Sequence, residues 1–345
     1  MPFESRELKL VLHSRDHLAQ KISELFCCVH RRMGVLADMG GGWDVIYLDR
    51  ELLPIGSPVL ERLLIRKGIP IVYDFDDAIF LPDVSDANRP FKWLKWPQET
   101  GEICQLSAHV IGGNDYLKAY ALQSNRHVSV VPTTIDTDTY TPKGSVKIRG
   151  LPVIGWSGSL TTLKHLRTVE TALQALKKSA PFRLKVLGSP DFFLPGLDVE
   201  SKGWDAGFEV SDLKSFDVGI MPLPDDEWSR GKCELKALQY MAVGVPVVAS
   251  PVGVNSQIIE DGKNGFLAAS ETGWVEKLSL LLSDEDLRRR FAKEGRRTVE
   301  ERYSAKVHAP RVLEILEQVG RTKKNFRVNE SAAAHLGSHK DGSTL

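Results

Sequence analysis

The chain has 345 residues, of which 45 are lysine or arginine and 45 are aspartate or glutamate, so its formal net charge at pH 7 is zero. This balance argues against a general electrostatic grip on nucleic acid and requires any basic site to be local. At this length two domains of ordinary size, each with its own hydrophobic core, are expected.

Cysteine usage and the N-terminal residues predict the compartment. The four cysteines form no CxxC pair and no His/Cys cluster at zinc-ligand spacing, and Cys27 and Cys28 are expected to be buried thiols. The N-terminus has neither the apolar stretch of a signal peptide nor the roughly 18 apolar residues of a membrane span. We therefore expect a cytoplasmic protein, and peripheral contact with the inner face of the membrane stays open.

The first part of the chain alternates short apolar runs with helical patterns. Each run ends in turn residues, which is typical of strands in a parallel sheet. The predicted strands are 45–48, 69–73, 109–111 and 128–131. Asn114 is expected to cap the helix after the third strand. Residues 1–142 are therefore interpreted as one α/β domain.

A polar, glycine-containing stretch, 143–150, is interpreted as an interdomain linker because it has no apolar face to bury. A second alternating series follows in 151–303. Its predicted strands are 153–156, 184–187, 218–221 and 245–249, and its helices lie around 162–178, 233–242 and 271–282. Residues 285–320 are expected to form two terminal helices, the second spanning 304–322, and 323–345 to be disordered because periodicity is lost. Two doubly wound α/β domains result.

The most informative segment is 230–253, RGKCELKALQYMAVGVPVVASPVG. It has the period of a helix, breaks at Gly244 and continues as an apolar strand, which is half of a βαβ unit. Arg230, Lys232 and Lys236 lie at the start of the helix, where free N–H groups and the helix dipole already favour anions. Such a place suits a diphosphate.

The end of this segment, Tyr-Met-Ala-x-Gly-x-Pro-Val-Val-Ala-Ser-x-x-Gly, resembles the nucleotide-sugar-binding segment of GT-B glycosyltransferases. The resemblance is to the large retaining family 4, glycosyl transferases group 1, and the Gly-Lys-Cys-x-x-Lys opening is similar to one of its subgroups. It covers most of the chain and implies a GT-B fold, in which two Rossmann-like domains face each other across a cleft. It also implies a nucleotide-diphosphate sugar as donor.

Two further motifs resemble parts of the same donor site. Residues 154–159, Ile-Gly-Trp-Ser-Gly-Ser, are similar to the family's glycine turn, where Gly158 and Ser159 let backbone N–H groups approach the diphosphate. The resemblance places Gly253, Val254 and Asn255 in a turn whose amides lie beside the donor.

Lys164 stands where the family carries a phosphate-binding lysine. A solvated lysine at a helix start is the alternative. The arginine that the family places directly after the turn glycine is Ser159 here, and Arg230 or Lys232 could supply the missing cation.

The family's pair of glutamates, separated by seven residues across the donor helix, is absent. Alignment on Met241 places Gly231 and Gln239 at these positions. The resemblance implies that Gln239 accepts hydrogen bonds from ribose hydroxyls without the strength of a charged acceptor. Glu234 is a candidate substitute for the first glutamate, and an acid favoured by the helix dipole is the alternative.

Three carboxylates, Asp74, Asp76 and Asp77, follow the second predicted strand. Carboxylates this close repel one another, so partners are expected. The subgroup's Asp-Phe-Asp-Asp-Ala element implies that Asp76 or Asp77 contacts the acceptor hydroxyl. A structural role in a turn or helix cap and a Mg²⁺ site are the alternatives. GT-B enzymes generally work without a metal, so neither metal nor cofactor is expected.

The resemblance implies a hexosyltransferase that works with retention in cell-envelope polysaccharide or glycoconjugate synthesis, on a glycan or lipid-linked acceptor. Lys232 and Lys164 are the candidates for stabilising the leaving diphosphate. The family's opening strand and glycine-rich turn are not found before residue 43, so the first domain is interpreted as shortened. An epimerase or hydrolase of the same fold, and a nucleotide-sugar-binding protein without transferase activity, remain alternatives.

Overall fold

The computed structural model describes residues 27, 29–34, 42–53, 57–81 and 98–337, and the chain forms two compact units. One unit combines residues up to Val131 with those from Arg311 onward, and the other is the continuous segment Pro132–Pro310. The boundary thus precedes the segment 143–150, which packs on the second unit. Lys143 donates through Nζ to the Phe216 carbonyl at 2.6 Å, and the Val146 carbonyl accepts from Arg288 Nε at 3.0 Å.

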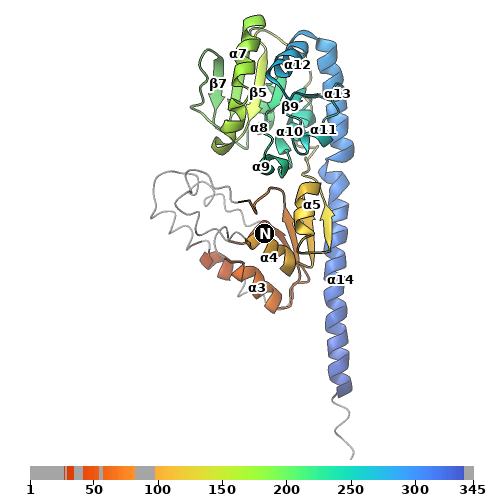
Figure 1. Ribbon diagram of the computed structural model, residues 1–345. Coiled ribbons are helices and arrows are strands. Elements are labelled where there is room, and N and C mark those ends of the chain that lie inside the picture. Colours follow the sequence, from red (N-terminus) through yellow and green to blue (C-terminus); the bar gives the residue numbers. More distant parts are fainter. Residues whose placement is uncertain (1–26, 28, 35–41, 54–56, 82–97, 338–345) are drawn as a thin grey trace, which may run out of the picture. The chain divides into compact units, whose positions relative to one another are not determined.

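The first unit, which contains the helices labelled α3, α4 and α5 in Figure 1, is built on a parallel sheet in the order β1-β2-β3-β4. Its strands are β1 (Ile46–Asp49), β2 (Ile71–Phe75), β3 (His109–Gly112) and β4 (Val128–Val130). The helices between them are α3 (Val59–Arg66), α4 (Glu99–Leu106) and α5 (Asp115–Ala121). Asn114 caps α5 as predicted, because its Oδ1 accepts from the Leu117 N–H at 2.9 Å.

The terminal helix α14 (Ala305–Gly337) completes the core of the first unit, although it begins in the second. Ile315 of α14 packs with Val72 of β2 and Ile111 of β3. Pro310 lies inside the helix at the boundary between the units.

The second unit contains a six-stranded parallel sheet in the order β7-β6-β5-β8-β9-β10. Numbered by their succession along this unit, the strands follow the order 3-2-1-4-5-6 of doubly wound nucleotide-binding folds. The strands are β5 (Val153–Ser157), β6 (Arg183–Leu187), β7 (Asp198–Lys202), β8 (Val218–Met221), β9 (Val247–Ala249) and β10 (Phe266–Leu267). The helices are α6 (Leu163–Arg167), α7 (Glu170–Ser179), α8 (Glu209–Lys214), α9 (Glu227–Arg230), α10 (Leu235–Ala242), α11 (Asn255–Ile258), α12 (Glu271–Ser283) and α13 (Glu285–Arg302), with a 3₁₀ turn η2 (Leu160–Thr162) before α6.

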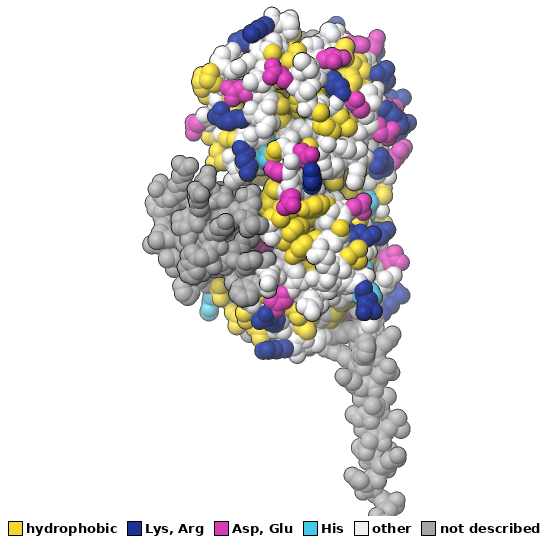
Figure 2. Space-filling view, viewed as in Figure 1, with side chains coloured by type: hydrophobic (Ala, Val, Ile, Leu, Met, Phe, Trp, Pro, Cys, Tyr) yellow, Lys and Arg dark blue, Asp and Glu magenta, His cyan; other side chains and the backbone are white. Residues whose placement is uncertain are grey.

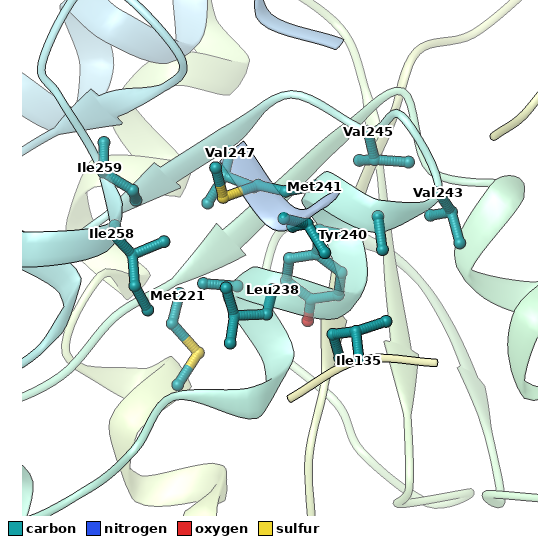
Figure 3. Close-up of a cluster of buried hydrophobic side chains, with 14 of the residues drawn as sticks. Ile135, Met221, Leu238, Tyr240, Met241, Val243, Val245, Val247, Ile258 and Ile259 are labelled. Carbon is teal, nitrogen blue, oxygen red and sulfur yellow. The ribbon is translucent and has the colours of Figure 1, made fainter. Parts of the chain in front are cut away.

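Helices cover both faces of this sheet, and each face has its own apolar cluster. On one face Leu238, Tyr240 and Met241 of α10 pack among Met221 of β8 and Val247 of β9 (Figure 3). On the other face α7 and α12 pack against strand residues that alternate with these. The result is a three-layer α/β/α unit, as predicted.

Two glycines make room for an aromatic pair at the centre of the sheet. A Cβ on Gly155 of β5 would lie 2.0 Å from the Phe216 ring, and one on Gly219 of β8 would lie 2.6 Å from the Tyr240 ring. Phe216 and Tyr240 pack edge to face, with ring centroids 5.8 Å apart. Both rings therefore approach the strand backbone directly.

The structure differs from the prediction in several elements. Strands β7 and β10 were not predicted, because β7 is polar and half-exposed and β10 is two residues long. The helix predicted for 162–178 is divided between α6 and α7, where the Thr168 hydroxyl donates to the His165 carbonyl at 2.6 Å. Helix α14 continues to Gly337 instead of ending at residue 322.

The prediction for the cysteines near the N-terminus was wrong for Cys27, which is exposed. Cys28 and the apolar run 8–12 lie outside the described residues. No helix in the described part of the chain combines the length and apolarity needed to cross a membrane. On the face seen in Figure 2, basic and acidic side chains intermingle over the described surface, as the balanced composition predicts.

We predict that Gly155→Ala lowers the free energy of unfolding by about 1–3 kcal/mol, because the new methyl group must displace the Phe216 ring. Gly203→Ala is the matched control, since a Cβ there meets nothing within 4 Å. Urea denaturation followed by tryptophan fluorescence measures both. Equal stability of the two variants would contradict the packing described for the sheet centre.

Candidate functional site

Strands β5 and β8 lie side by side at the point where the winding of the second unit reverses. In open α/β sheets, ligands bind beyond the carboxyl ends of the strands at such a switch point. The segments that follow these strands are 158–162, after β5, and 222–236, after β8. They carry most of the predicted donor-site residues.

The turn after β5 is closely packed against the next strand connection. Gly188 has φ +102°, and a Cβ there would lie 1.7 Å from the Gly158 carbonyl oxygen. The Gly158 N–H donates to the Leu187 carbonyl at 3.0 Å, and the Ser159 N–H donates to Thr162 Oγ1 at 2.9 Å. Both N–H groups, which the sequence analysis placed at the diphosphate, are therefore already bonded within the protein.

Three lysines gather beside this turn from different parts of the sequence. Lys236, in the first turn of α10, donates to Thr162 Oγ1 at 3.4 Å, and its Nζ lies 5.1 Å from the Trp156 ring centroid. Lys164 lies on α6, directly before the buried His165, which is 4% exposed. Burial, and then the charges of Lys232, Lys164 and Lys236 in that order, lower the pKa of His165 to about 4. All three ammonium groups therefore act on the same imidazole.

A tyrosine hydroxyl positions α10 at this place. Tyr240 is fully buried, and its Oη accepts a hydrogen bond from the Ser157 N–H, at the last residue of β5, at 2.7 Å. The start of α10, with Lys236, is thereby held over the turn that carries Gly158.

Arg230 and Glu234 lie on either side of Lys232 in different environments. Arg230 is exposed and its Nε donates to Asp225 Oδ1 at 2.8 Å, a hydrogen bond that lowers the pKa of Asp225. Glu234 is 4% exposed and has φ 53°, so that α10 begins only at Leu235. A non-glycine residue in the left-handed region costs free energy and often marks a functional position.

Gln239 points into a network of polar side chains. It is buried, and its Nε2 donates to Tyr140 Oη at 2.9 Å. The Tyr140 hydroxyl donates to Glu209, which also accepts from Trp204 Nε1 at 2.7 Å. Burial and the bond to Glu209 raise the pKa of Tyr140 to about 12. The amide nitrogen of Gln239 thus donates within the protein.

The turn after β9 packs against the end of α9. Gly253 has φ +55°, and a Cβ there would lie 2.9 Å from the Ser229 carbonyl oxygen. Val254 and Asn255 are buried, and Asn255 donates through Nδ2 to the Ser250 carbonyl at 3.1 Å. Within the described residues, Asn255 Oδ1 is buried without a hydrogen-bond partner. This turn therefore adjoins the segment that leads to Lys232.

The carboxylates of the first unit have the partners that the sequence analysis required. Arg50, directly after β1, donates through Nη2 to Asp76 at 2.6 Å and to Asp77 at 2.7 Å. The Tyr47 hydroxyl donates to Asp74. Burial raises the pKa of Asp74 to about 6, and Asp49 and Asp76 add to the rise while the Tyr47 bond opposes it. Arg50 has φ 59°, so it shares with Glu234 a left-handed backbone.

Among the described residues, no group of three or more His, Cys, Asp or Glu side chains is arranged to hold a metal ion.

Sequence reasoning missed three residues, His165, Arg50 and Tyr47. Part of the signal was present in the sequence, because His165 follows the predicted Lys164 and because Arg50 directly follows β1, the strand that neighbours β2.

Residues 151–284 match the family described as Glycosyl transferases group 1. D-inositol 3-phosphate glycosyltransferase of Stackebrandtia nassauensis is 28% identical over 199 residues, which are 48% of this chain and 43% of that protein. Spore coat protein SA of Bacillus subtilis is 24% identical over 279 residues, 70% of this chain and 73% of that protein. The match thus spans less than half the length of the first relative.

Solved structures with the same fold are more distant in sequence. The Anabaena protein HepE in complex with UDP and glucose has a TM-score of 0.62 at 16% identity, covering 83% of this chain and 80% of that one. Sucrose-phosphate synthase from Thermosynechococcus elongatus has a TM-score of 0.60 at 15% identity, covering 81% and 75%. These likenesses confirm the predicted GT-B type of fold.

We predict that Asp74→Asn stabilises the protein relative to the parent as the pH rises from 4 to 8. A carboxyl pKa raised to about 6 means that the folded state binds the proton more tightly, so stability is lost as the parent ionises between about pH 4 and pH 6. The gain is at most about 3 kcal/mol. Urea denaturation at both pH values measures it, and a pH-independent difference would contradict the environment described for Asp74.

Proposed function

We propose that the protein transfers a sugar from a nucleotide-diphosphate sugar to an acceptor hydroxyl. The match of residues 151–284 to glycosyl transferases group 1 and the GT-B type of fold support this proposal. The observation that carries the proposal is the gathering of Lys164, Lys232 and Lys236 at the carboxyl end of β5. Anionic groups bind well where ammonium groups and a helix start coincide. The UDP in the Anabaena HepE crystal supports a nucleotide diphosphate as the anion.

In the proposed reaction the bond between the anomeric carbon and the diphosphate oxygen breaks as the acceptor oxygen bonds to that carbon. Negative charge grows on the leaving diphosphate, and Lys232 and Lys164 stabilise it most in the transition state, with Lys236 and Arg230 beside them. We propose retention, with the acceptor proton passing to an oxygen of the leaving phosphate. This chemistry requires no metal and no cofactor.

We propose roles for the remaining donor-site residues from their places around the lysines. Gly158 and Ser159 shape the turn that leaves room for the diphosphate, and Gly253, Val254 and Asn255 form the second turn beside it. Glu234 is buried and lies between Lys232 and Lys236 in the sequence. It replaces the first glutamate of the family's pair, which is absent here, as the carboxylate that contacts the donor sugar. Gln239 accepts from the ribose through its amide oxygen.

The acceptor side of the proposal rests on the first unit. Arg50 holds Asp76 and Asp77 at the carboxyl end of the sheet, where we propose that a carboxylate accepts from a sugar hydroxyl. We propose a glycan or lipid-linked acceptor and a role in cell-envelope polysaccharide or glycoconjugate synthesis. The protein would bind this acceptor at the inner face of the membrane. The named activities of the relatives, such as D-inositol 3-phosphate glycosyltransferase, support an acceptor hydroxyl.

The proposal is tested by thermal stabilisation with nucleotide diphosphates and their sugars, followed by product analysis with the best ligand. Ligands that bind only the folded state raise its melting temperature. Transfer that survives EDTA supports the proposal, and abolition by EDTA with rescue by Mg²⁺ would assign Asp74, Asp76 and Asp77 to a metal. Binding without turnover would favour the function of a nucleotide-sugar-binding protein without transferase activity. The presence of Gly231 where the family has its first glutamate is consistent with that function. Free or epimerised sugar as the product would identify a hydrolase or epimerase.

We predict that Lys232→Ala weakens nucleotide-sugar binding and transfer at least tenfold, while the melting temperature without ligand changes little. The lost group is half-exposed and faces the proposed diphosphate site, so its removal costs binding more than packing. Lys178→Ala is the control, because Lys178 is exposed on α7. Equal affinity of the two variants in calorimetric titration would remove Lys232 from the site.

We predict that Gln239→Leu weakens binding of the nucleotide diphosphate, because the amide oxygen proposed for the ribose is lost. Tyr140→Phe is the matched control, since it removes the same protein hydrogen bond and keeps the amide. Both variants are expected to lose about 1 kcal/mol of stability. Equal loss of affinity in both would give Gln239 a purely structural role. Gln239→Glu would place two carboxylates on the Tyr140 hydroxyl, so restoring the family's glutamate is expected to destabilise the network.

A further inference from the structure

His165 lies among the three lysines and has no role in the proposed transfer. It is 4% exposed, and its Nδ1 is buried without a hydrogen-bond partner in the described part of the chain. A buried ring nitrogen without a partner costs free energy. It also means that no protein hydrogen bond at Nδ1 favours either protonation state of the imidazole, which then depends chiefly on burial and on nearby charge.

The charged groups that face His165 come from each element packed around it. Lys164 precedes it on α6, Lys236 reaches Thr162 from α10, and Lys232 lies between α9 and α10. Asp226 opposes the lysines, and its Oδ1 caps α9 by accepting from the Ser229 N–H at 2.7 Å. Burial first, and then the positive charges of the lysines, lower the pKa of His165 and keep the imidazole neutral.

We propose that His165 takes up a proton when a nucleotide-diphosphate sugar binds to these lysines, and that it then supplies a further positive charge beside the diphosphate. The inference rests on the proposed function. A diphosphate diester carries two negative charges, which offset the field of the lysines at the imidazole. Imidazole is the side chain whose ordinary pKa lies nearest to neutral pH, so His165 is the group in this cluster that can respond.

The sign of the resulting pH dependence follows from linkage. The pKa of His165 in the free protein is lowered to about 4, first by burial and then by the lysines. A bound diphosphate offsets the part due to the lysines and leaves the part due to burial, so the pKa in the complex lies above 4 and below the ordinary 6.5. Binding therefore tightens as the pH falls through the pKa of the complex, and the gain between pH 7.5 and pH 5.5 is at most about tenfold.

Calorimetric titration with UDP-glucose, GDP-mannose and ADP-glucose tests the inference. Their diphosphates are esterified at both ends, so they do not titrate between pH 5.5 and pH 7.5. For the parent we expect tighter binding at pH 5.5 than at pH 7.5, by at most about tenfold, and a net uptake of protons at pH 5.5 measured in buffers of different ionisation enthalpy. His165→Gln should bind equally at both pH values. His127→Gln, at an exposed histidine of the first unit, should behave like the parent.

Each result has a definite meaning. Equal affinity of the parent at the two pH values, or the same pH dependence in His165→Gln, overturns the inference and leaves the proposed function standing. Failure of all three sugars to bind at either pH removes both. If His165→Gln does not fold, proton uptake by the parent decides alone, and zero uptake overturns the inference.

Discussion

The hydrogen bond from the Ser157 N–H to the Tyr240 hydroxyl is the contact on which the site of the second unit depends. It joins the last residue of β5 to the middle of α10, and it requires the Tyr240 ring to lie on the glycine of β8. Because Lys236 is one helical turn before Tyr240, the same contact sets where its ammonium group lies. The packing of the apolar core therefore determines the position of the cationic site. Without Gly155 and Gly219 at the sheet centre, α10 could not approach the sheet closely enough to bring Lys236 to the turn after β5.

Much of this could be predicted from sequence because buried parallel strands are continuous apolar runs. The strands β1 to β6, β8 and β9 were predicted, with bounds that differ from the observed ones by a residue or two. Strand β7 was missed because Asp198–Lys202 has the polarity of a loop. Lys232 and Lys236 were predicted from the local pattern of a helix start, whereas Lys164 was predicted from the resemblance. What sequence could not supply was the competition for backbone groups, since the N–H groups of Gly158 and Ser159 are used within the protein.

The partners of the acidic cluster in the first unit could be predicted from the sequence only in part. Repulsion among Asp74, Asp76 and Asp77 predicted that partners exist, but it could not say which, because Arg50 and Tyr47 come from a neighbouring strand whose register is set by the fold. Arg50 accepts a left-handed backbone to reach both carboxylates. Glu234 has the same conformation in the second unit, so the two positions of this kind among the described non-glycine residues both adjoin the proposed sites.

The discontinuous first unit has a consequence for biosynthesis. Its β-strands are translated early, but the Ile315 side chain that packs on Val72 and Ile111 belongs to a helix translated after the whole second unit. Domains usually fold in the order in which they leave the ribosome. Here the continuous second unit can finish first, and the early strands must wait for the last helix, exposing an apolar sheet face in the meantime. The interval in which the nascent chain most needs protection from aggregation is thus set by the length of the unit that separates the two halves of the first.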